Sequence, residues 1–483
     1  MGGSVRGLAA EHLARNYREL RELLRRGDVG ELVRRRRGRY YGLVHYMLSP
    51  AVRGELSPSL VSELVEVVDL NPVSSVRAVG RVWREGRPEE VLDRLLEPFS
   101  RELQVKVREM ARELSEVVRV ELFPEFVEHD AHHARDVVVL SLELMGLYPP
   151  RFRVYDVYLV VAAALLHDAS MYSYVEEDVE YDEVRDNHSL YSTSIALRLR
   201  ERLERDGVQM SDGELADICA LVRYHQKRCR LSREYARRVK ELGEDVDSSL
   251  PPLYELVLGE EEPKGELDAR ALGPLVGRGP DEALRLRGLA AIFKLADACD
   301  VQIARFRERR GEYISEYLRH KMNSLRKLQL SKERGGSDEC KESEKGEGRE
   351  RYMWRQVLHN FKHASIREVR VVREGGAGVI VVEENPGFLR GYERVREDLV
   401  RWAVREIVAE GYLVLDDLRA LAERGGWAEL KRVRVEWASG ISEDYEVEKG
   451  PSLLRELPSE KEVVEEYADY VRENFSRMVG RSR

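Results

Sequence analysis

The segment Val157–Ser170, VYLVVAAALLHDAS, decides the fold of this chain. Apolar side chains occupy nearly every side of it, which predicts a central helix that is packed all round. The apolar run ends at His167 and Asp168. Two ionisable side chains that close a fully buried helix are costly unless they are paired or bound to a metal. We therefore interpret the doublet as functional.

A helix that precedes this segment brings a third ionisable residue to the core. In HDAHHARDVVVLSLELMG, which starts at His129, a stripe at i, i+4, i+7 and i+11 contains His133 and then three aliphatic residues. The pattern predicts that His133 faces the core. His129 lies one turn earlier on the same face, whereas His132 is about 100 degrees off the stripe and is the weakest candidate of the three.

An acidic residue, Asp297, extends the pattern further along the chain. In GLAAIFKLADACDVQIARF it shares a helix face with three apolar residues, and Lys294 and Asp300 lie one turn to either side. His188 and His225 lie between the two blocks. Any one of these residues alone would more simply be a satisfied core histidine or a cap aspartate. Their occurrence on several separate helices predicts a metal site, because imidazoles and carboxylates are the usual ligands of catalytic metals.

These residues resemble the signature of a known family. His133 with ARDV after it, the doublet His167–Asp168, and Asp297 in LADACD look like the ordered motif of the HD superfamily of metal-dependent phosphohydrolases. The resemblance covers residues 120–310. The segments RDNHSLYSTSI around His188 and LVRYHQ around His225 are similar to the two further histidines of HD proteins that hold two metals, such as cyclic-nucleotide and cyclic-dinucleotide phosphodiesterases.

The resemblance implies a helical HD bundle and a cofactor of one or two divalent metal ions, which could be Mn, Fe, Mg, Ni or Zn. It implies that Asp168 bridges two metals. The ligands of the first would be His133, His167, Asp168 and Asp297, and those of the second would be Asp168, His188 and His225.

The sequence also departs from its relatives in this superfamily. Gln226, Lys227 and Arg228 follow His225 where the cyclic-dinucleotide enzymes have a GYP tripeptide. The extended pattern of the deoxynucleotide triphosphohydrolases is missing around the doublet as well. Neither substrate class is therefore expected.

The charge of such a site favours a ligand that carries phosphate. Two divalent cations against two aspartates leave a net charge of about +2. A metal-activated water would attack phosphorus, with Asp168 as the catalytic ligand, and we assign protonation of the leaving group to His129. Arg185 and Lys294, each three residues before a predicted ligand, are candidate substrate-binding phosphate clamps. The other interpretation of these two is an ordinary surface ion pair.

The predicted function is that of a hydrolase, a metal-dependent phosphohydrolase or phosphodiesterase that cleaves a phosphate ester of a nucleotide-like small molecule. One alternative is a non-catalytic nucleotide-sensing protein, which would use the same residues. Another is a nucleic-acid-associated protein that uses the run Arg34–Arg37 and the Arg39, Tyr40 and Tyr41 that follow it. That short run is more simply a solvated helix face.

The periodicity divides the chain into four segments and predicts a mainly α fold. Residues 1–115 read as an N-terminal helical region and 116–330 as the HD domain, whereas 331–350 have almost no apolar residues and predict a flexible charged linker. Residues 351–483 predict a small α+β module. Its expected elements are a hairpin over Arg367–Pro386 with a turn at Gly375–Gly378, a helix over Leu389–Glu423, a strand over Val433–Trp437 and a helix over Glu460–Met478.

Composition excludes several classes of protein. The net charge of the 483 residues is -9, which argues against a general footprint for nucleic acid or anionic membranes. No apolar run reaches the roughly 18 residues that a membrane span needs, and the N-terminus has no apolar core of the signal-peptide type. We therefore expect a cytoplasmic protein without a membrane partner. The 4 cysteines show no CxxC spacing, so we expect reduced thiols.

The balance of polar residues is unusual. Arginine far outnumbers lysine, and asparagine and glutamine are scarce. This composition is typical of thermophile proteins, in which ion-pair networks replace thermolabile amides, and GC-rich codon usage is the alternative explanation. A homo-oligomer is expected on base rates alone.

Overall fold

The computed structural model describes residues 106, 131–148, 152, 154–171, 187–205, 209–302, 354–355, 357–423 and 428–480. Within them the chain is mainly helical, with a small sheet in its C-terminal part, so the predicted fold class is confirmed. The predicted linker 331–350 and nearly all of the predicted helical region 1–115, including Arg34–Arg37, lie outside these residues.

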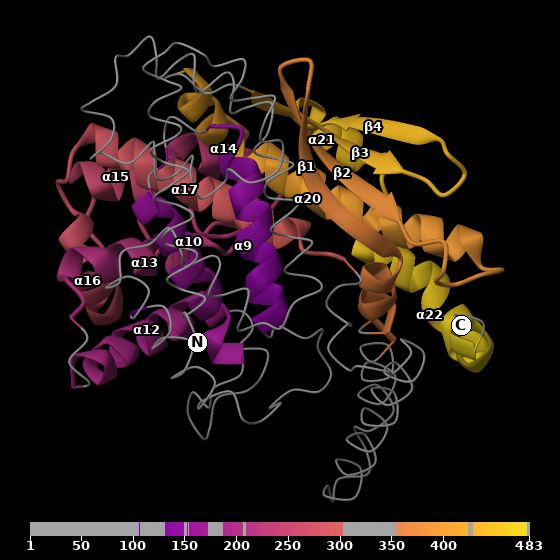
Figure 1. Ribbon diagram of the computed structural model, residues 1–483, viewed down its shortest axis with the longest axis horizontal. Coiled ribbons are helices and arrows are strands. Elements are labelled where there is room, and N and C mark those ends of the chain that lie inside the picture. Colours follow the sequence, from indigo (N-terminus) through magenta and orange to yellow (C-terminus); the bar gives the residue numbers. More distant parts are fainter. Residues whose placement is uncertain are drawn as a thin grey trace, which may run out of the picture.

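Five helices form the bundle that carries the predicted site (Figure 1). The central one, α10, is buried along almost its whole length, as its apolar sequence predicts. It packs against α9, α12, α13 and α17, and α17 also packs against α9 and α13. The bounds of the five helices are Ala131–Met145 for α9, Val154–Leu166 for α10, His188–Arg205 for α12, Asp212–Tyr224 for α13 and Pro280–Cys299 for α17.

Shorter helices surround this bundle. A 3-10 turn, η2 (Ala169–Met171), follows α10 and lies against α12. Other short elements pack on the long helices: α15 on α17, and α16 and η3 on α13. Their bounds are Leu253–Leu258 for α15, Glu266–Leu272 for α16 and Gly273–Leu275 for η3.

A four-stranded sheet in the order β1-β2-β3-β4 makes up the C-terminal part. β1 (Ile366–Glu374) and β2 (Ala377–Glu384) form the predicted antiparallel hairpin. Its turn is shorter than the predicted Gly375–Gly378. Gly375 and Gly376 have positive φ values, whereas Gly378 lies inside β2. A Cβ on Gly378 would come within 2.6 Å of Leu147 Cδ1, so the glycine allows close packing of the strand.

The other two strands follow after a long helical crossover. β2 pairs in parallel with β3 (Glu429–Glu436), which confirms the strand predicted around Val433, and β3 pairs antiparallel with β4 (Ser442–Glu446). The sequence of β4, SEDYE, has no alternation of apolar residues, which is why periodicity does not predict it.

The crossover helix α20 (Glu393–Glu423, 31 residues) joins the sheet to the bundle. It packs against α17 and against β3, so it lies between the two (Figure 1). Gly288 of α17 lets the helices approach closely, because a Cβ there would lie 2.5 Å from Leu421 Cδ1 of α20. α14 (Arg233–Glu241) also packs on α20. The helix predicted over Leu389–Glu423 is thus confirmed, with a later start.

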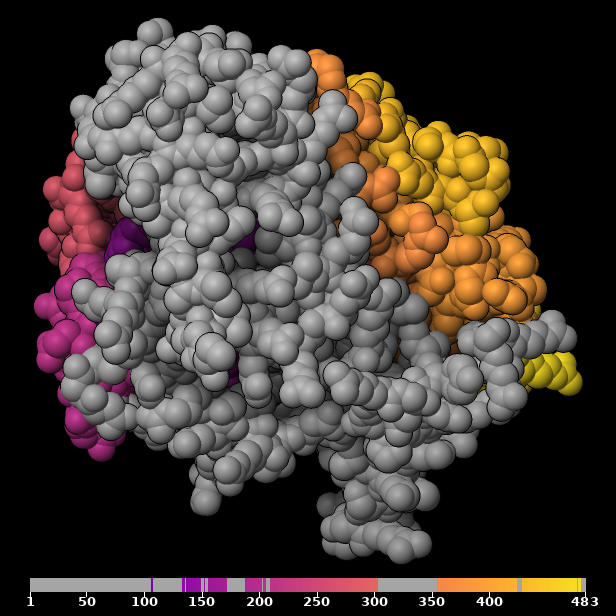
Figure 2. All heavy atoms as spheres, in the orientation of Figure 1, coloured from indigo at the N-terminus to yellow at the C-terminus, as the bar shows by residue number. Residues whose placement is uncertain are grey.

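The chain ends in η5 (Val447–Lys449), α21 (Pro451–Leu454) and α22 (Glu460–Gly480), the last of which confirms the predicted final helix. A second apolar cluster between α20 and α22 includes Trp402, Phe361 and Phe475. In the space-filling view the residues of the sheet and of α22, orange to yellow, gather on one side, and those of α15 and α16 lie on the other (Figure 2).

The cysteines and the hydropathy of the helices were the subject of two further predictions. Cys219, Cys229 and Cys299 are buried free thiols, as expected, and Cys340 lies outside the described residues. Within the described ranges, no helix combines the length and the apolar character that a membrane crossing requires.

Candidate metal centre

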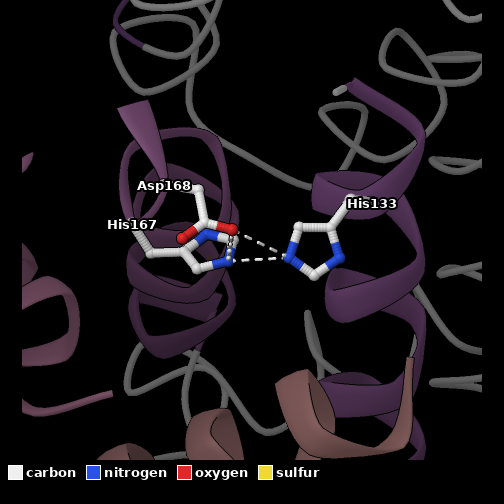
Figure 3. A group of neighbouring side chains, drawn as sticks. All are labelled: His133, His167 and Asp168. Atoms are coloured by element: carbon white, nitrogen blue, oxygen red, sulfur yellow. Dashed lines mark hydrogen bonds and ion pairs between the residues drawn. The ribbon is translucent and has the colours of Figure 1, made fainter. Parts of the chain in front are cut away.

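The predicted doublet lies where α10 ends, in the middle of the bundle. His167 and Asp168 are buried and point toward α9 (Figure 3). The backbone of the last helical turn fixes the first of them, because His167 Nδ1 donates to the Ala164 carbonyl at 2.9 Å. The imidazole Nε2 is thereby directed away from its own helix.

His133 of α9 faces the doublet across the bundle. Its Nε2 lies 2.9 Å from His167 Nε2 and 3.3 Å from Asp168 Oδ2 (Figure 3). Asp297, near the end of α17, brings Oδ1 to 3.2 Å from His133 Nε2 and 3.6 Å from His167 Nε2. The stripe below His133 is buried as predicted, since Val137, Leu140 and Leu144 are all 1% exposed or less.

A second group of donors lies on the other side of Asp168. His188 opens α12 and His225 ends α13, and their Nε2 atoms are 2.7 Å apart. Asp168 Oδ1 lies 3.5 Å from His188 Nε2 and 3.9 Å from His225 Nε2. Asp168 therefore presents one carboxylate oxygen to each group. The facing ligand atoms lie within 4.8 Å of one another in the set His133, His167 and Asp168 and in the set Asp168, His188 and His225, so each set could hold a metal ion.

The hydrogen bonds around the imidazoles show that the donor set fits divalent metals. An imidazole nitrogen that faces a carbonyl or carboxylate oxygen carries the proton, and the other nitrogen of the neutral ring then has a free lone pair. Two such lone pairs cannot bond to each other, so the facing Nε2 atoms need either a shared proton or a metal cation between them. Nδ1 faces an oxygen at 2.6 Å in His133 (Asp300), 2.9 Å in His167 (Ala164) and 2.6 Å in His225 (Val222).

His188 is held differently, through a side-chain amide. Its Nδ1 lies 2.7 Å from Gln226 Nε2, and Gln226 Oε1 accepts from Ser189 Oγ at 3.0 Å. In this orientation His188 carries its proton on Nε2 and donates to His225. The two ends of an amide exchange by a simple flip, after which Gln226 accepts from Nδ1 and frees His188 Nε2 for a metal.

The electrostatics of the centre are dominated by its two carboxylates. Burial alone would lower the pKa of His167, but Asp168 and then Asp297 outweigh it and raise that pKa to about 9. Burial alone would raise the pKa of Asp297, but the imidazoles of His133 and His167 hold it well below its usual range. Burial, and next the neighbouring imidazoles of His188 and His167, lower the pKa of His225 to about 3. The same negative field that holds a proton on His167 would attract a metal cation.

A pocket of about 330 Å³ opens beside the second group of donors. Two cations that follow His225 in sequence lie in its wall, together with a carboxylate from α20. Burial raises the pKa of that carboxylate, Glu410, although Lys294 lowers it. The lining residues are His188, His225, Gln226, Lys227, Arg228, Lys294, Asp297, Ala298 and Glu410.

Lys294 supports the loop that follows α13. Its side chain is 1% exposed, and Nζ donates to the carbonyls of Tyr224 (3.0 Å), Gln226 and Cys229 (3.4 Å). An ammonium group has three protons, so these bonds use all of them. The structure thus places Lys294 in the pocket wall as an anchor for the segment that carries His225, with no donor left over for a phosphate.

The structure brings together all six residues predicted as ligands, from five different helices or helix ends. Of the three other predicted site residues, Lys294 lies in the pocket wall, and His129 and Arg185 lie outside the described residues. Sequence reasoning gave no role to Asp300, Gln226 or Glu410. Glu410 had the same signal as the doublet, an acid inside an apolar run, IVAEGYLVL.

Comparison with protein families gives one match. The family model described as HD-CE matches residues 123–408, which include every one of the six predicted ligands. No curated protein matches the chain, and no solved structure matches it.

Proposed function

The chain belongs to the HD-CE family, whose domain is of the HD type, and from this premise we propose that it is a metal-dependent phosphohydrolase or phosphodiesterase of nucleotide-like substrates. The observation that supports the proposal best is the position of Asp168, with Oδ2 toward His133 and His167 and Oδ1 toward His188 and His225. A carboxylate shared between two imidazole groups is suited to bridging two metals.

The described side chains have distinct roles in this proposal. His133, His167, Asp168 and Asp297 would hold one metal, and His188 and His225 would hold a second together with Asp168. Divalent metals bound there would supply positive charge for phosphoryl oxygens and an activated water as nucleophile. The field of Asp168 and Asp297 selects cations, and the buried surroundings strengthen that field.

The pocket suggests where the rest of the substrate lies. Lys227 and Arg228 line it beside His225, and both cations can contact phosphate oxygens that do not reach the metals. Lys294 keeps these residues in place by holding the backbone on either side of them. In this view Lys294 acts as a positioning residue, while the acid role of His129 and the clamp role of Arg185 stay predictions from the sequence.

A manganese-supplemented panel of nucleotides and nucleotide esters tests the proposal, with elemental analysis of the same protein samples. We expect the wild type to bind metal and to release phosphate or a nucleoside monophosphate. Asp168→Asn should lose both metal and turnover. Asp212→Asn, which alters a carboxylate that is 71% exposed on α13, is the matched control and should retain both.

Two results would contradict hydrolysis in different ways. A wild type that binds metal and is stabilised by a nucleotide without consuming it would instead indicate a sensor. A wild type that binds neither metal nor nucleotide would overturn the metal centre itself.

A further inference from the structure

A second pocket, of about 540 Å³, lies along the outer side of α14 and shares no lining residue with the pocket at the metal centre. One helical stripe, at i, i+3, i+4 and i+7, supplies half of its wall: Arg233, Ala236, Arg237 and Lys240. We call this pocket the α14 groove. The remaining lining residues are Arg230, Glu241, Pro252 and Glu261.

The α14 groove carries more positive than negative charge. Four of its lining residues are cationic and two are acidic. One of the acids, Glu241, is already engaged by Arg237 and by the Tyr412 hydroxyl, and the hydrogen bond from Tyr412 lowers its pKa. Arg233 likewise lies 3.4 Å from Glu255 and 3.2 Å from Glu260. These pairs leave the other two cations, opposed by the one acid that remains in the lining, Glu261, to set the charge of the groove.

Arg230 and Lys240 are those two cations. Arg230 donates one Nη2 hydrogen to the Leu250 carbonyl, but its buried Nε–H meets no acceptor in the part of the chain that the structure describes. Lys240 is exposed, and no acidic side chain among the described residues lies within ion-pair distance of it. An ammonium group and a guanidinium group without an acidic partner among the described residues both favour an anion in the groove.

The spacing of the cations favours a chain of phosphates over a single carboxylate. Arg233 and Lys240 are seven residues apart, which is about 10 Å along a helix. Cations spread over that length match a ligand whose negative charges are spread as well, although Arg233 and Arg237 would exchange an acidic partner for it. Ala236 and Pro252 add an apolar surface to the lining, and this surface can contact the flat ring of a nucleobase.

The groove is built on a rigid part of the molecule. The opposite side of α14 is fixed to α20, because Arg238 Nε and Nη2 donate to the two oxygens of Asp416 at 2.7 and 2.8 Å. Arg230 follows directly after Cys229, whose carbonyl Lys294 holds. A ligand would therefore meet a helix and a loop backbone that are already in position, which reduces the entropic cost of binding.

We propose that the α14 groove is a second ligand site, separate from the metal centre, that binds the phosphate chain of a polyphosphate or nucleotide through Arg230 and Lys240. The proposal concerns binding alone and does not depend on hydrolysis at the metal centre.

Calorimetric titration of the full chain with inorganic tripolyphosphate, in the presence of EDTA, tests the site while the metal centre is stripped. We expect saturable binding to the wild type and to Asp168→Asn. The double variant Arg230→Ala/Lys240→Ala should bind at least about tenfold more weakly, as expected for two lost charge-assisted contacts. The single variant Lys240→Glu, at an exposed position, should bind more weakly too and guards against misfolding at Arg230.

The matched control removes the same charge elsewhere. Arg270→Ala/Lys449→Ala alters two exposed cations, each with one acidic partner, and should bind as the wild type does. Equal binding of tripolyphosphate and ATP would indicate a site for the phosphate chain only, and tighter binding of ATP would indicate a nucleotide. The proposal would be overturned if the wild type did not bind tripolyphosphate or if Asp168→Asn lost binding. It would also be overturned if the control lost as much affinity as the double variant, or if adenosine bound as tightly as ATP.

Discussion

Asp300 Oδ2 accepts a hydrogen bond of 2.6 Å from Nδ1 of His133, which is 167 residues away in the chain. Asp300 is the C-cap of α17, and its carboxylate is fully buried. The bond fixes both the tautomer and the ring orientation of His133, whose Nε2 faces His167 and Asp168. An outer carboxylate of this kind commonly raises the basicity of a metal-binding imidazole.

Asp300→Ala should therefore weaken metal binding without removing any proposed ligand. We expect a loss of about 10- to 100-fold in metal affinity, measured by competition with a fluorescent chelator. Asp300→Asn can still accept the hydrogen bond and should recover part of the loss. The exposed Asp245→Ala serves as control, and an affinity for Asp300→Ala equal to that of this control would contradict the positioning role.

Metal affinity should depend on pH through His167. Because its pKa is about 9 in the metal-free protein, a metal must displace a proton from Nε2 at neutral pH. The apparent affinity should rise about tenfold per pH unit for that one proton and level off above pH 9. Calorimetry in buffers of different ionisation enthalpy counts the protons released. An affinity that is flat between pH 6.5 and 9 would disprove this assignment.

The stability of the metal-free protein should fall on both sides of pH 6.5. The raised pKa of His167 contributes stability that is complete below 6.5 and is lost as the pH rises through about 9. The lowered pKa of His225 acts in the opposite direction. The unfolded chain binds a proton at this residue below pH 6.5, whereas the folded chain binds it only below about pH 3, so stability is lost as the pH falls between these values. Urea unfolding in EDTA measures both limbs. His225→Gln should make the acid limb shallower and leave the alkaline limb unchanged, because the lowered pKa of Asp297 still contributes to the acid limb. An acid limb as steep as that of the wild type would contradict the contribution of His225.

Lys294→Met should destabilise the protein and loosen the second group of donors. The substitution keeps the length of the side chain but leaves three buried carbonyls with one donor fewer each. Unsatisfied buried polar groups cost about 1–3 kcal/mol apiece, so we expect a clear fall in melting temperature. Lys449→Met, at an exposed position, should have no effect. A Lys294→Met protein as stable as the wild type would contradict the anchoring role.

Gly288→Ala should separate α17 from α20. Its new Cβ would meet the Leu421 side chain at 2.5–2.7 Å, so this side chain must change its rotamer or the helices must shift, at a cost of about 1–3 kcal/mol. The matched control is Gly273→Ala, where φ is -50° and no atom lies within 4 Å of the new Cβ. That control should be neutral or slightly stabilising. Chemical denaturation compares the two, and equal stabilities would mean that the close approach is not needed.

The sequence predicts much of this architecture because periodicity reports burial. Helical spacing alone was enough to predict that His133 and the doublet after Val157–Leu166 lie in the core. The apolar stripe below His133 and the apolar residues on every side of Val157–Leu166 carried that prediction. The hairpin at Gly375–Gly376 was predictable from two β-branched runs around glycines. These features depend on residues that are close together in the chain, and their pattern can be read directly from a single sequence.

Contacts between distant segments could not be predicted in the same way. Helical spacing placed Asp300 one turn after Asp297, but the backbone leaves the helix there with φ -80° and ψ 66°, and this directs the carboxylate to His133. Lys294 was predicted to face a substrate because it is close in sequence to Asp297. Its actual partners are carbonyls 65 to 70 residues earlier in the chain, and no local pattern identifies them.

The long crossover α20 has a consequence for how the protein is made. On the ribosome, α17 with Asp297 and Asp300 emerges about a hundred residues before α20, which at 5–20 residues per second is a delay of about 5–20 s. Until then the apolar face of α17 around Gly288 has no cover, and Glu410 has not yet closed one wall of the pocket. The nascent chain thus passes through an interval in which this face of α17 and the pocket wall that Glu410 provides are still incomplete.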